Sequence, residues 1–243
     1  MARLLELTDI SFTYPGANRP VLDRVNLTLD RGQRVGLIGP NGCGKTSLFH
    51  LIMGLLQPTE GTILFKGKPV RSSGDFRRVR EKIGLLFQDA DDQLFSPTVI
   101  EDVVFGPLNL GAAPEEARAI ALKTLEKLGL SRLERRITHQ LSGGEKKLVS
   151  LATILAMEPE ALLLDEPTNN LDPETRKRLI NILTTLEPGY MIISHDWDFL
   201  ADTCSEIYVM DQGRVTLCDQ SCLHVHRHAH PYGTQPHRHN NHQ

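Results

Sequence analysis

The segment Gly39-Pro40-Asn41-Gly42-Cys43-Gly44-Lys45-Thr46 decides the fold, because it matches the pattern G-x-x-x-x-G-K-[ST] at every fixed position. It lies between the apolar run 34–38, which predicts a buried strand, and the apolar segment 46–53, which predicts a helix. This is the setting that phosphate binding requires, since main-chain N–H groups and the helix N-terminus converge on the anion. We therefore expect Lys45 to reach the β- and γ-phosphates of a nucleotide and the Thr46 hydroxyl to bind Mg²⁺.

Two acidic residues follow a second apolar run. Leu162-Leu163-Leu164 predicts a buried strand, and Asp165 and Glu166 stand at its carboxyl end, where sites open in parallel sheets. Asp165 would complete the Mg²⁺ shell, as in other phosphate-loop enzymes, and Glu166 would polarise the attacking water. A strand that merely ends in solvated acids is the alternative, and the phosphate-binding segment argues against it.

The alternation of short apolar runs with helical patterns predicts an α/β fold. Further strands are expected over 83–87, 161–165, 190–194 and 207–211, and helices over 114–128 and from Ser142 and Asp172 onward. Strands that are apolar on both faces and separated by helices form a mostly parallel sheet core that is covered on both sides. The segments 4–12 and 21–29 alternate apolar and polar residues instead, which predicts an N-terminal antiparallel β subdomain.

The composition of the 243 residues argues against several classes of protein. Lys and Arg number 27 against 30 Asp and Glu, a formal net charge of −3, so bulk charge offers no support for nucleic-acid binding. No apolar run approaches the ~20 residues that span a bilayer, and we expect no signal peptide. The four cysteines, Cys43, Cys204, Cys218 and Cys222, form no dense disulfide framework, which favours a reduced, cytosolic protein.

The segment Leu141-Ser142-Gly143-Gly144-Glu145 separates this chain from other phosphate-loop ATPases and kinases. Ser142 and Glu145 have the spacing of a capping box, so the glycines lie at a helix N-terminus that offers free N–H groups to an anion. A well-capped helix without a ligand is the alternative. The segment resembles the signature motif of ATP-binding cassette ATPases. That resemblance implies that it completes the ATP site of a second copy, with ATP sandwiched head-to-tail.

Other motifs of the same family follow in family order. Tyr14 resembles the aromatic residue that stacks on adenine, and a core tyrosine of an edge strand is the alternative. Gln88 matches the Q-loop glutamine, which senses Mg²⁺ and the attacking water, and Asn170-Leu171-Asp172 resembles the D-loop that crosses the dimer interface. His195 matches the switch histidine that contacts the γ-phosphate. Together these motifs cover about residues 4–217.

The resemblance implies a P-loop NTPase of ABC type with ATP and Mg²⁺ as its ligands. Catalysis is assigned to Glu166, His195 and Gln88, and Mg²⁺ binding to Thr46, Gln88 and Asp165. The residues expected to contact ATP are Tyr14, Gly39, Pro40, Asn41, Gly42, Cys43, Gly44, Lys45, Thr46, Ser47, Ser142, Gly143, Gly144 and Glu145. The departures from the family pattern are Glu145 in place of glutamine, Leu148 in place of arginine and Asn169-Asn170 in place of a small pair. None removes a ligand of phosphate or metal.

We expect the ATPase domain to span residues 1–217, with an α-helical subdomain over about 88–160. From Cys218 the apolar pattern stops, and residues 218–243 are expected to form a flexible His-rich tail. His224, His226, His228 and His230 alternate, so an extended chain puts them on one face, where their imidazoles can bind Ni²⁺ or Co²⁺. A solvated tail without function is the alternative.

The stretch 88–109 indicates the class of transporter. It closely resembles the ATPase subunits of energy-coupling-factor importers, particularly the cobalt and nickel branch, in which this region forms the groove that grips a coupling helix of the membrane subunit. Its five acids, Asp89, Asp91, Asp92, Glu101 and Asp102, are expected to pair with arginines on that helix, and Phe95 and Phe105 to supply apolar anchors. A solvated acidic loop is the alternative.

The resemblance thus implies the ATP-hydrolysing subunit of an importer for nickel or cobalt ions, lying peripherally on the cytoplasmic face of the membrane. Its expected partners are a transmembrane coupling subunit, a substrate-binding membrane subunit and a second ATPase copy, and no nucleic acid. Three alternatives stay open. They are a transporter of the same type for another cargo such as a vitamin, a non-transport cassette ATPase, and a metal-buffering protein with vestigial hydrolysis.

Overall fold

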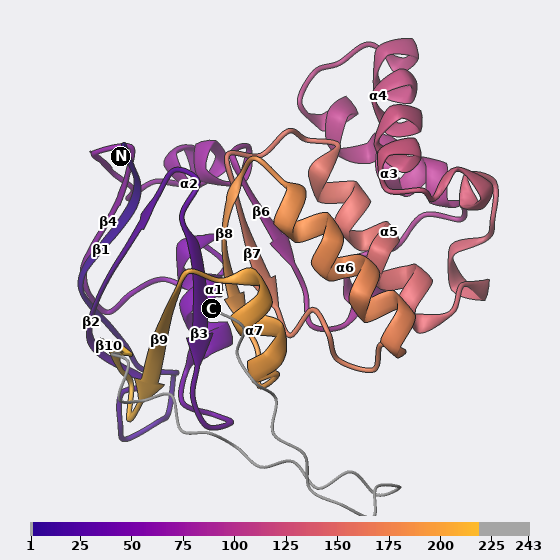
Figure 1. The fold of residues 1–243 in the computed structure, drawn as a ribbon. Coiled ribbons are helices and arrows are strands. Elements are labelled where there is room, and N and C mark those ends of the chain that lie inside the picture. Colours follow the sequence, from indigo (N-terminus) through magenta and orange to yellow (C-terminus); the bar gives the residue numbers. More distant parts are fainter. Residues whose placement is uncertain (1, 219–243) are drawn as a thin grey trace, which may run out of the picture.

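The computed structural model describes residues 2–218, which form two β-sheets and seven α-helices. The four-stranded sheet has the order β2-β1-β4-β5 and consists of β1 (Arg3–Phe12), β2 (Leu22–Asp30), β4 (Glu60–Phe65) and β5 (Lys68–Pro69). Its neighbouring strands are antiparallel, as the alternating N-terminal pattern predicts. Figure 1 shows this sheet at one side of the molecule and a helical block with α3 (Val99–Asn109) and α4 (Pro114–Lys127) at the other.

The six-stranded sheet lies between them and has the order β10-β9-β3-β8-β7-β6. Its strands are β3 (Arg34–Ile38), β6 (Ile83–Leu86), β7 (Ala161–Asp165), β8 (Gly189–Ile193), β9 (Glu206–Asp211) and β10 (Arg214–Leu217). Every neighbouring pair is parallel except β9 with β10. The mostly parallel core sheet is therefore confirmed, and the carboxyl ends of β3, β6, β7 and β8 share one edge, where sites of such sheets form.

Both faces of the central sheet are buried, because successive residues of a strand enter different cores. In β7, Ala161 and Leu163 pack in the core that contains α1 (Lys45–Ile52) and the antiparallel sheet. Leu162 and Leu164 pack in the core that contains α5 (Gly143–Leu155), α6 (Pro173–Thr185) and α7 (Trp197–Thr203). A strand buried on both faces has to be apolar throughout, which explains the continuous apolar runs of the sequence.

The helix starts follow the capping signals in the sequence. The Ser142 hydroxyl accepts a hydrogen bond from the Glu145 N–H at 3.2 Å, and the Glu145 carboxylate accepts one from the Ser142 N–H at 3.1 Å, so the capping box of α5 is confirmed. Asp172 caps α6, and Pro173 occupies its first position. α4 begins at Pro114, as predicted.

Several elements are not anticipated by the sequence patterns. They are β4, β5, β10, α2 (Ser73–Arg80), α3, α7 and three 3-10 turns over Ala90–Asp92, Ser131–Leu133 and Thr138–Gln140. No helix is predicted over α3, because Gly106 and Pro107 lie inside it and weaken the helical pattern. Packing of Val99 and Val103 in the second core stabilises this helix despite its sequence.

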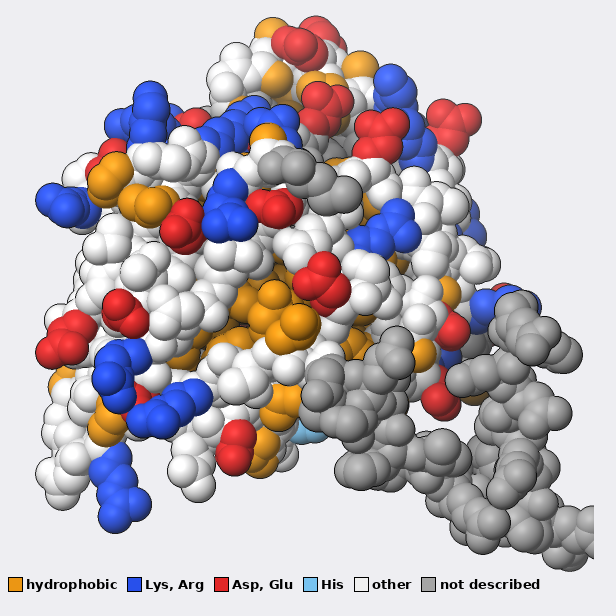
Figure 2. Space-filling view, turned by 60° about the vertical axis from the view of Figure 1, so that its left-hand side comes forward, with side chains coloured by type: hydrophobic (Ala, Val, Ile, Leu, Met, Phe, Trp, Pro, Cys, Tyr) orange, Lys and Arg blue, Asp and Glu red, His pale blue; other side chains and the backbone are white. Residues whose placement is uncertain are grey.

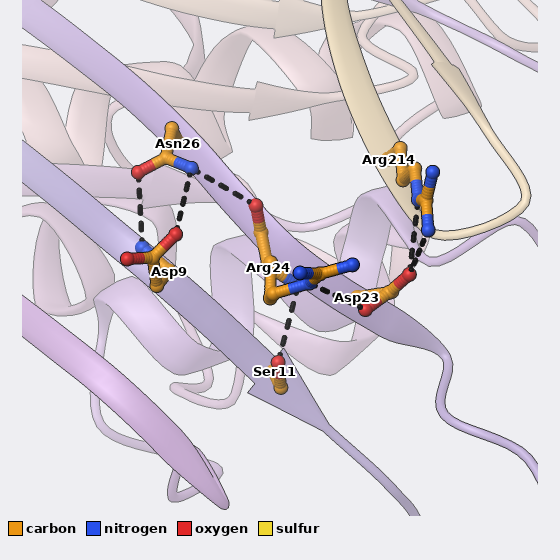
Figure 3. A network of polar contacts seen from close by, with 6 residues as sticks. All are labelled: Asp9, Ser11, Asp23, Arg24, Asn26 and Arg214. Carbon is orange, nitrogen blue, oxygen red and sulfur yellow. Dashed lines mark hydrogen bonds and ion pairs between the residues drawn. The ribbon is translucent and has the colours of Figure 1, made fainter.

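Paired irregularities in β1 and β2 shape the edge of the antiparallel sheet (Figure 3). Asp9 and Arg24 both have left-handed backbones, with φ of 50° and 49°, and the register of the two strands shifts between them. The Asn26 side chain closes the gap, since its Oδ1 accepts from the Asp9 N–H at 3.0 Å and its Nδ2 donates to the Asp9 carboxylate and the Arg24 carbonyl. These contacts replace ladder hydrogen bonds that a bulge removes.

The β9–β10 hairpin is tied to β2. The Arg214 guanidinium donates to Asp23 Oδ2 at 2.7 and 2.9 Å, and the Asp23 N–H donates to the Gly213 carbonyl at 2.9 Å. The same guanidinium lowers the pKa of the Asp23 carboxyl, so the pair is charged at neutral pH. This contact holds the first residues of β2, and with them Val21, against the central sheet.

The surface carries charges of both signs. On the face drawn in Figure 2, Lys and Arg side chains alternate with Asp and Glu side chains around a depression that exposes hydrophobic side chains. The charge on this face is therefore mixed rather than of one sign. None of the helices in residues 2–218 is long and apolar enough to cross a bilayer.

Candidate functional site

The phosphate-binding segment joins β3 to α1 with a backbone that requires glycine at two positions. Gly44 has a φ of 110°, and a Cβ there would lie 2.8 Å from a Leu22 methyl carbon. A Cβ on Gly39 would lie 2.1 Å from the main-chain oxygen of Met210. The glycines therefore let the loop pack tightly between β2 and β9, which fixes where its N–H groups can meet a phosphate.

Lys45 is held on its own loop. It is 7% exposed, and its Nζ donates to the carbonyls of Gly39 at 2.7 Å and Pro40 at 3.0 Å, with the Cys43 sulfur 3.9 Å away. These acceptors are neutral, whereas a phosphate oxygen would offer a stronger, charge-assisted hydrogen bond. The ammonium is thus placed to move from the loop carbonyls to an anion bound in the loop.

Thr46 and Asp165 bring two oxygen donors together. The Thr46 hydroxyl donates to Asp165 Oδ2 at 2.7 Å, and Asp165 is 4% exposed. Burial raises the pKa of the Asp165 carboxyl, and the hydrogen bond from Thr46 opposes that rise. A buried carboxylate beside a hydroxyl is the all-oxygen donor set that suits Mg²⁺, so the residues fit that ion. Across residues 2–218, no group of three or more His, Cys, Asp or Glu side chains could hold a metal ion on its own.

Glu166 and His195 meet beyond the carboxyl ends of β7 and β8. The His195 Nε2 lies 3.3 Å from Glu166 Oε1 and 3.0 Å from Asn41 Oδ1. Glu166 has a left-handed backbone with a φ of 44°, and its N–H donates to the Ile193 carbonyl at 2.9 Å. Burial raises the pKa of the Glu166 carboxyl, while the neighbouring His195 lowers it. A buried carboxylate with an increased proton affinity is suited to general-base chemistry.

One cavity of about 560 Å³ collects most of the predicted site. The predicted residues that line it are Tyr14, Asn41, Gly42, Gly44, Lys45, Thr46, Ser47, Gln88, Asp165, Glu166 and His195. The remaining residues of the phosphate-binding segment, Gly39, Pro40 and Cys43, contact the Lys45 ammonium instead. The cavity therefore combines a glycine-rich loop with its lysine, a hydroxyl–carboxylate pair and a second buried carboxylate.

Tyr14 is exposed at this cavity. Its ring is 41% exposed, its hydroxyl lies 2.9 Å from the Ser47 hydroxyl, and the Phe12 ring meets it edge to face at 4.8 Å. A core tyrosine would be buried, so this alternative does not describe its environment. An exposed ring that is held at two points can stack on a nucleotide base without a large loss of conformational entropy.

The signature segment lies outside that cavity. Of its residues, Gly143 lines a neighbouring cavity of about 640 Å³, which also reaches Thr46, Gln88 and Asp165. The Ser142 hydroxyl donates to Glu145 Oε2 at 3.1 Å. Within a single chain, none of Ser142 to Glu145 lines the cavity of about 560 Å³, and Gly143 shares only the neighbouring cavity with Thr46. Asn170 lines the same neighbouring cavity.

Four residues at the site are missed by the sequence reasoning. Val21, Asn169 and Ile193 line the cavity of about 560 Å³, and Asn169 was noted only as a departure from the family pattern. Lys147 is 4% exposed and lies beside Gln88, whose carbonyl accepts a hydrogen bond from its Nζ at 2.7 Å. No motif marks these positions, because each depends on a contact between segments that are distant in the sequence.

An apolar groove lies between α3 and the segments around it. The groove encloses a cavity of about 410 Å³, and its lining includes Leu55, Phe95, Phe105 and Met157. Phe95 is 66% exposed and Phe105 is 47% exposed, and their rings meet edge to face at 4.8 Å. Large exposed aromatic side chains that cluster in this way are more frequent at binding surfaces than on the rest of a protein's surface. We call this surface the phenylalanine groove.

Asp102 is not available to a partner, so the prediction that it pairs with an external arginine is wrong. It is 3% exposed, and its carboxylate accepts hydrogen bonds from the N–H groups of Phe95 at 3.1 Å and Ser96 at 2.9 Å and from the Thr138 hydroxyl at 3.2 Å. The Asp102 carboxylate, in the first turn of α3, accepts from part-buried N–H groups of the loop before it, and these contacts keep it from an outside partner. The predicted metal ligands His224, His226, His228 and His230 lie outside the described residues.

Comparison with protein families gives one match to this chain. The model described as ABC transporter matches residues 22–169, which include the phosphate-binding segment, β7 and the signature segment. The chain is 53% identical over 236 residues to a putative ABC transporter ATP-binding protein of Nitratidesulfovibrio vulgaris, covering 97% of this chain and 86% of that protein. It is 44% identical over 230 residues to the energy-coupling factor transporter ATP-binding protein EcfA of Methanothermobacter thermautotrophicus, covering 93% and 73%.

Two solved structures extend the comparison to the fold. The chain superposes on cbiO1 of Clostridium perfringens, described as part of the ABC transporter complex cbiONQ, with a TM-score of 0.79 and 37% identity over 89% of this chain and 88% of that one. It matches the dimeric ATP-binding cassette MJ0796 bound to ADP and Pi with a TM-score of 0.79 and 28% identity, covering 87% and 96%. The predicted cassette fold is confirmed by these neighbours.

Proposed function

Because this chain belongs to the ABC transporter family, we propose that it is the ATPase subunit of an energy-coupling-factor type importer for nickel or cobalt ions. ATP hydrolysis coupled to transport follows from the family, and the likeness to EcfA and cbiO1 supports the type of transporter. The observation that carries the assignment is one cavity in which the Thr46–Asp165 pair lies beside the Glu166–His195 pair.

ATP would bind with its adenine against Tyr14 and its phosphates over the segment from Gly39 to Ser47. Lys45 would exchange its carbonyl acceptors for the β- and γ-phosphates. Thr46 and Asp165 would hold Mg²⁺, with Gln88 as a further oxygen donor from the same cavity. When bound, Mg²⁺ neutralises charge that builds up on the phosphates during transfer.

Hydrolysis would depend on Glu166 and His195. Glu166 would accept a proton from the attacking water, for which its raised pKa is suited. His195 would turn from Asn41 toward the γ-phosphate. Its ring is half-exposed, and its Nε2 contacts side chains rather than the main chain, so the ring has room to rotate. In-line attack would place the water opposite the leaving oxygen, beyond the γ-phosphate, and Glu166 and His195 both line the cavity of about 560 Å³ in which that phosphate would lie.

A second copy of the chain would complete the site. Ser142, Gly143, Gly144 and Glu145 lie at the N-terminus of α5, away from the cavity that holds the remaining groups. A helix N-terminus with glycines offers N–H groups to the γ-phosphate of the other copy. The dimeric state of the similar cassette MJ0796 supports this arrangement.

The phenylalanine groove is the proposed contact with a transmembrane coupling subunit. Phe95 and Phe105 would anchor one of its helices, and the exposed acids Asp89, Asp91 and Asp92 would meet its basic residues. This contact would hold the chain peripherally on the cytoplasmic face of the membrane. A separate membrane subunit would bind the cargo.

The domain organisation and the cargo belong to the same proposal. Residues 1–217 would form the ATPase domain, with a helical subdomain over about 88–160, and residues 218–243 a tail whose His224, His226, His228 and His230 would bind Ni²⁺ or Co²⁺. The tail is the feature of this chain that favours a transition metal over another cargo such as a vitamin.

Purification from detergent-solubilised membranes, followed by mass spectrometry of the co-purifying proteins, tests the proposal. Recovery of a multi-helix coupling subunit together with a metal-binding membrane subunit is the expected result. Recovery of a vitamin-binding membrane subunit instead would support the same type of transporter with a vitamin as its cargo. Recovery with only soluble proteins or RNA would favour a non-transport ABC ATPase instead.

A further inference from the structure

Lys147 is a buried lysine on the signature helix that neither the motifs nor the proposed mechanism uses. It lies in α5, five residues after the helix cap Ser142, and is 4% exposed. Its Nζ donates to two successive main-chain carbonyls, that of Phe87 at 3.1 Å and that of Gln88 at 2.7 Å. One side chain of α5 therefore holds the first two residues of the loop that follows β6.

The environment of Lys147 is costly for an ammonium group. No carboxylate forms an ion pair with it within residues 2–218, so its hydrogen-bond acceptors are neutral carbonyls. Burial lowers the pKa of Lys147, and the negative charges of Asp89, Asp165 and Glu166 oppose that effect. A buried methionine would pack at this position without such a cost, so the lysine makes sense as a hydrogen-bond donor to the loop.

Two further contacts join α5 to the same loop. The Gln93 amide donates to the Ser150 carbonyl at 2.8 Å and to the Thr153 hydroxyl at 2.9 Å, and its oxygen accepts from the Phe87 N–H at 3.3 Å. Lys146 forms an ion pair with Asp91 at 2.6 Å, three residues beyond Gln88. Of these contacts, the one from Lys147 reaches the main chain of Gln88 itself.

We propose that Lys147 is a positioning residue for ATP hydrolysis, which couples the orientation of the Gln88 side chain to the position of α5. The Gln88 side chain projects where the two cavities meet, since it lines both of them together with Thr46 and Asp165. Two fixed carbonyls on successive residues limit the rotation of the peptide between them, and so limit where that side chain can point. The proposal rests on the role given to Gln88 above.

This connection gives the signature helix a direct effect on its own chain's site. When the N-terminus of α5 meets the nucleotide of a second copy, any shift of α5 moves Nζ of Lys147 and with it the main chain at Gln88. Without Lys147, α5 would still be joined to the loop by Gln93 and Lys146, but Gln88 would no longer follow the helix.

A double-mutant cycle on the full-length protein tests this link. We expect Lys147→Met to lower kcat by about tenfold while changing KM for ATP by less than about threefold, because the phosphate-binding segment is untouched. In a Gln88→Ala background the same substitution should change kcat by less than about twofold, since residues that act as a unit are not additive. Lys147→Arg, which keeps the donors, should restore kcat to within about threefold of wild type.

A matched lysine and a second measurement separate positioning from general destabilisation. Lys146→Met removes a neighbouring lysine that contacts the same loop, and should keep kcat within about twofold. In nucleotide-free protein, hydrogen exchange of the amides of residues 87–93 should be faster in Lys147→Met than in wild type or Lys146→Met. Should Lys147→Met fail to fold, Lys147→Ala, which also removes the donor, carries the same cycle.

Two outcomes would overturn the inference. One is an equal loss of kcat from Lys147→Met in both backgrounds, which would mean that Lys147 acts independently of Gln88. The other is exchange over residues 87–93 that Lys147→Met leaves unchanged. If the wild-type protein releases no phosphate from ATP, the proposed function itself fails, and the exchange measurement still reports whether Lys147 fixes the loop.

Discussion

Glu166 shows how one residue acquires its chemistry from backbone and burial together. Its left-handed backbone, fixed by the hydrogen bond to Ile193, turns the side chain out of the line of β7 toward His195. The adjacent Asp165 remains paired with Thr46. Two neighbouring acids thus face different partners, which is what a division between metal binding and proton transfer requires.

Replacing Glu166 with glutamine tests its role as the base. We expect Glu166→Gln to lower kcat for ATP hydrolysis by at least about a hundredfold, since a general base contributes factors of this order, while nucleotide binding persists. ATP should then trap a closed dimer, seen by size-exclusion chromatography with bound nucleotide. Turnover at the wild-type rate would refute the role given to Glu166.

The raised pKa of Glu166 also has a consequence for stability. A carboxyl whose pKa is higher in the folded state stabilises the fold at pH values below its unfolded pKa, and this contribution is lost as pH rises through the folded pKa. At pH 7 the nucleotide-free Glu166→Gln protein should therefore melt about 2 °C or more above wild type, and the difference should shrink in acid. Melting curves between pH 4 and 8 measure this trend, and a difference that grows toward acid would contradict it.

Glu145 places a carboxylate at the signature segment. Hydrogen bonding from the Ser142 main chain lowers the pKa of Glu145, so it is ionised at neutral pH and holds the Ser142 hydroxyl. In the proposed dimer this negative charge would lie near the γ-phosphate bound by the second copy, where it would oppose closure. In the Glu166→Gln background, Glu145→Gln should tighten ATP-dependent dimerisation by about three- to tenfold, because a repulsive charge is removed and the cap is kept.

Analytical ultracentrifugation at several ATP concentrations measures this effect. Glu126→Gln, an exposed carboxylate on α4, removes the same charge elsewhere and should leave dimerisation within about twofold. Weaker dimerisation of Glu145→Gln than of its parent would show that the carboxylate supports closure rather than opposing it.

At the scale of elements, Asp102 fastens α3 to the segment before the signature helix. Asp102→Leu would leave the N–H groups of Phe95 and Ser96 and the Thr138 hydroxyl without acceptors, and we expect a loss of about 3 kcal/mol in the free energy of unfolding. Asp102→Asn keeps an acceptor and should lose about 1 kcal/mol. Urea denaturation measures both, and the exposed Asp92→Leu should stay within about 0.5 kcal/mol of wild type.

Asp102 also shows where sequence reasoning stops. Its place in an acid-rich stretch predicts a surface residue, and its burial follows only from the path of the loop 93–98. By contrast, the strand, loop and helix around Gly39 to Thr46 form one local unit, and the caps Ser142 and Asp172 act within three residues of themselves. Elements fixed by local chemistry are predictable, whereas contacts such as that of Lys147 with Gln88 depend on how distant segments meet.

The same limit applies to the candidate site. Most of the phosphate-binding segment and the acids after β7 converge on one cavity, because parallel strands end at a common edge. Tyr14, Gln88 and His195 line the same cavity, whereas the signature segment lies outside it. The alternation of β7 between two cores could be inferred from its unbroken apolar run. The antiparallel pairing of β1 with β4 could not, since the partner strand lies some fifty residues away in the sequence.

At the scale of the whole molecule, a shortened chain tests the proposed division into an ATPase domain and a His-rich tail. Residues 2–218 contain both cores and the nucleotide cavity. Removal of residues 224–243 should therefore keep ATP hydrolysis within about twofold and remove most of the Ni²⁺ that the protein binds at pH 7, where neutral imidazoles are ligands. Equilibrium dialysis with equal nickel stoichiometry in full-length and truncated protein would contradict the metal-binding role.

The phenylalanine groove and the nucleotide cavity serve different partners, so they should be separable by mutation. Phe95 and Phe105 are exposed and pack on each other, so Phe95→Ala should change neither folding nor ATPase activity of the isolated protein by more than about twofold. Loss of a central aromatic anchor typically costs about 2 kcal/mol or more of binding, so recovery of the membrane subunit from solubilised membranes should fall by about thirtyfold. Leu217→Ala removes an apolar side chain that is 57% exposed on β10, outside the groove, and should keep that recovery. If Phe95→Ala recovers as much membrane subunit as wild type, the membrane subunit binds another surface. Equal losses in Phe95→Ala and Leu217→Ala would indicate a non-specific effect of surface hydrophobicity.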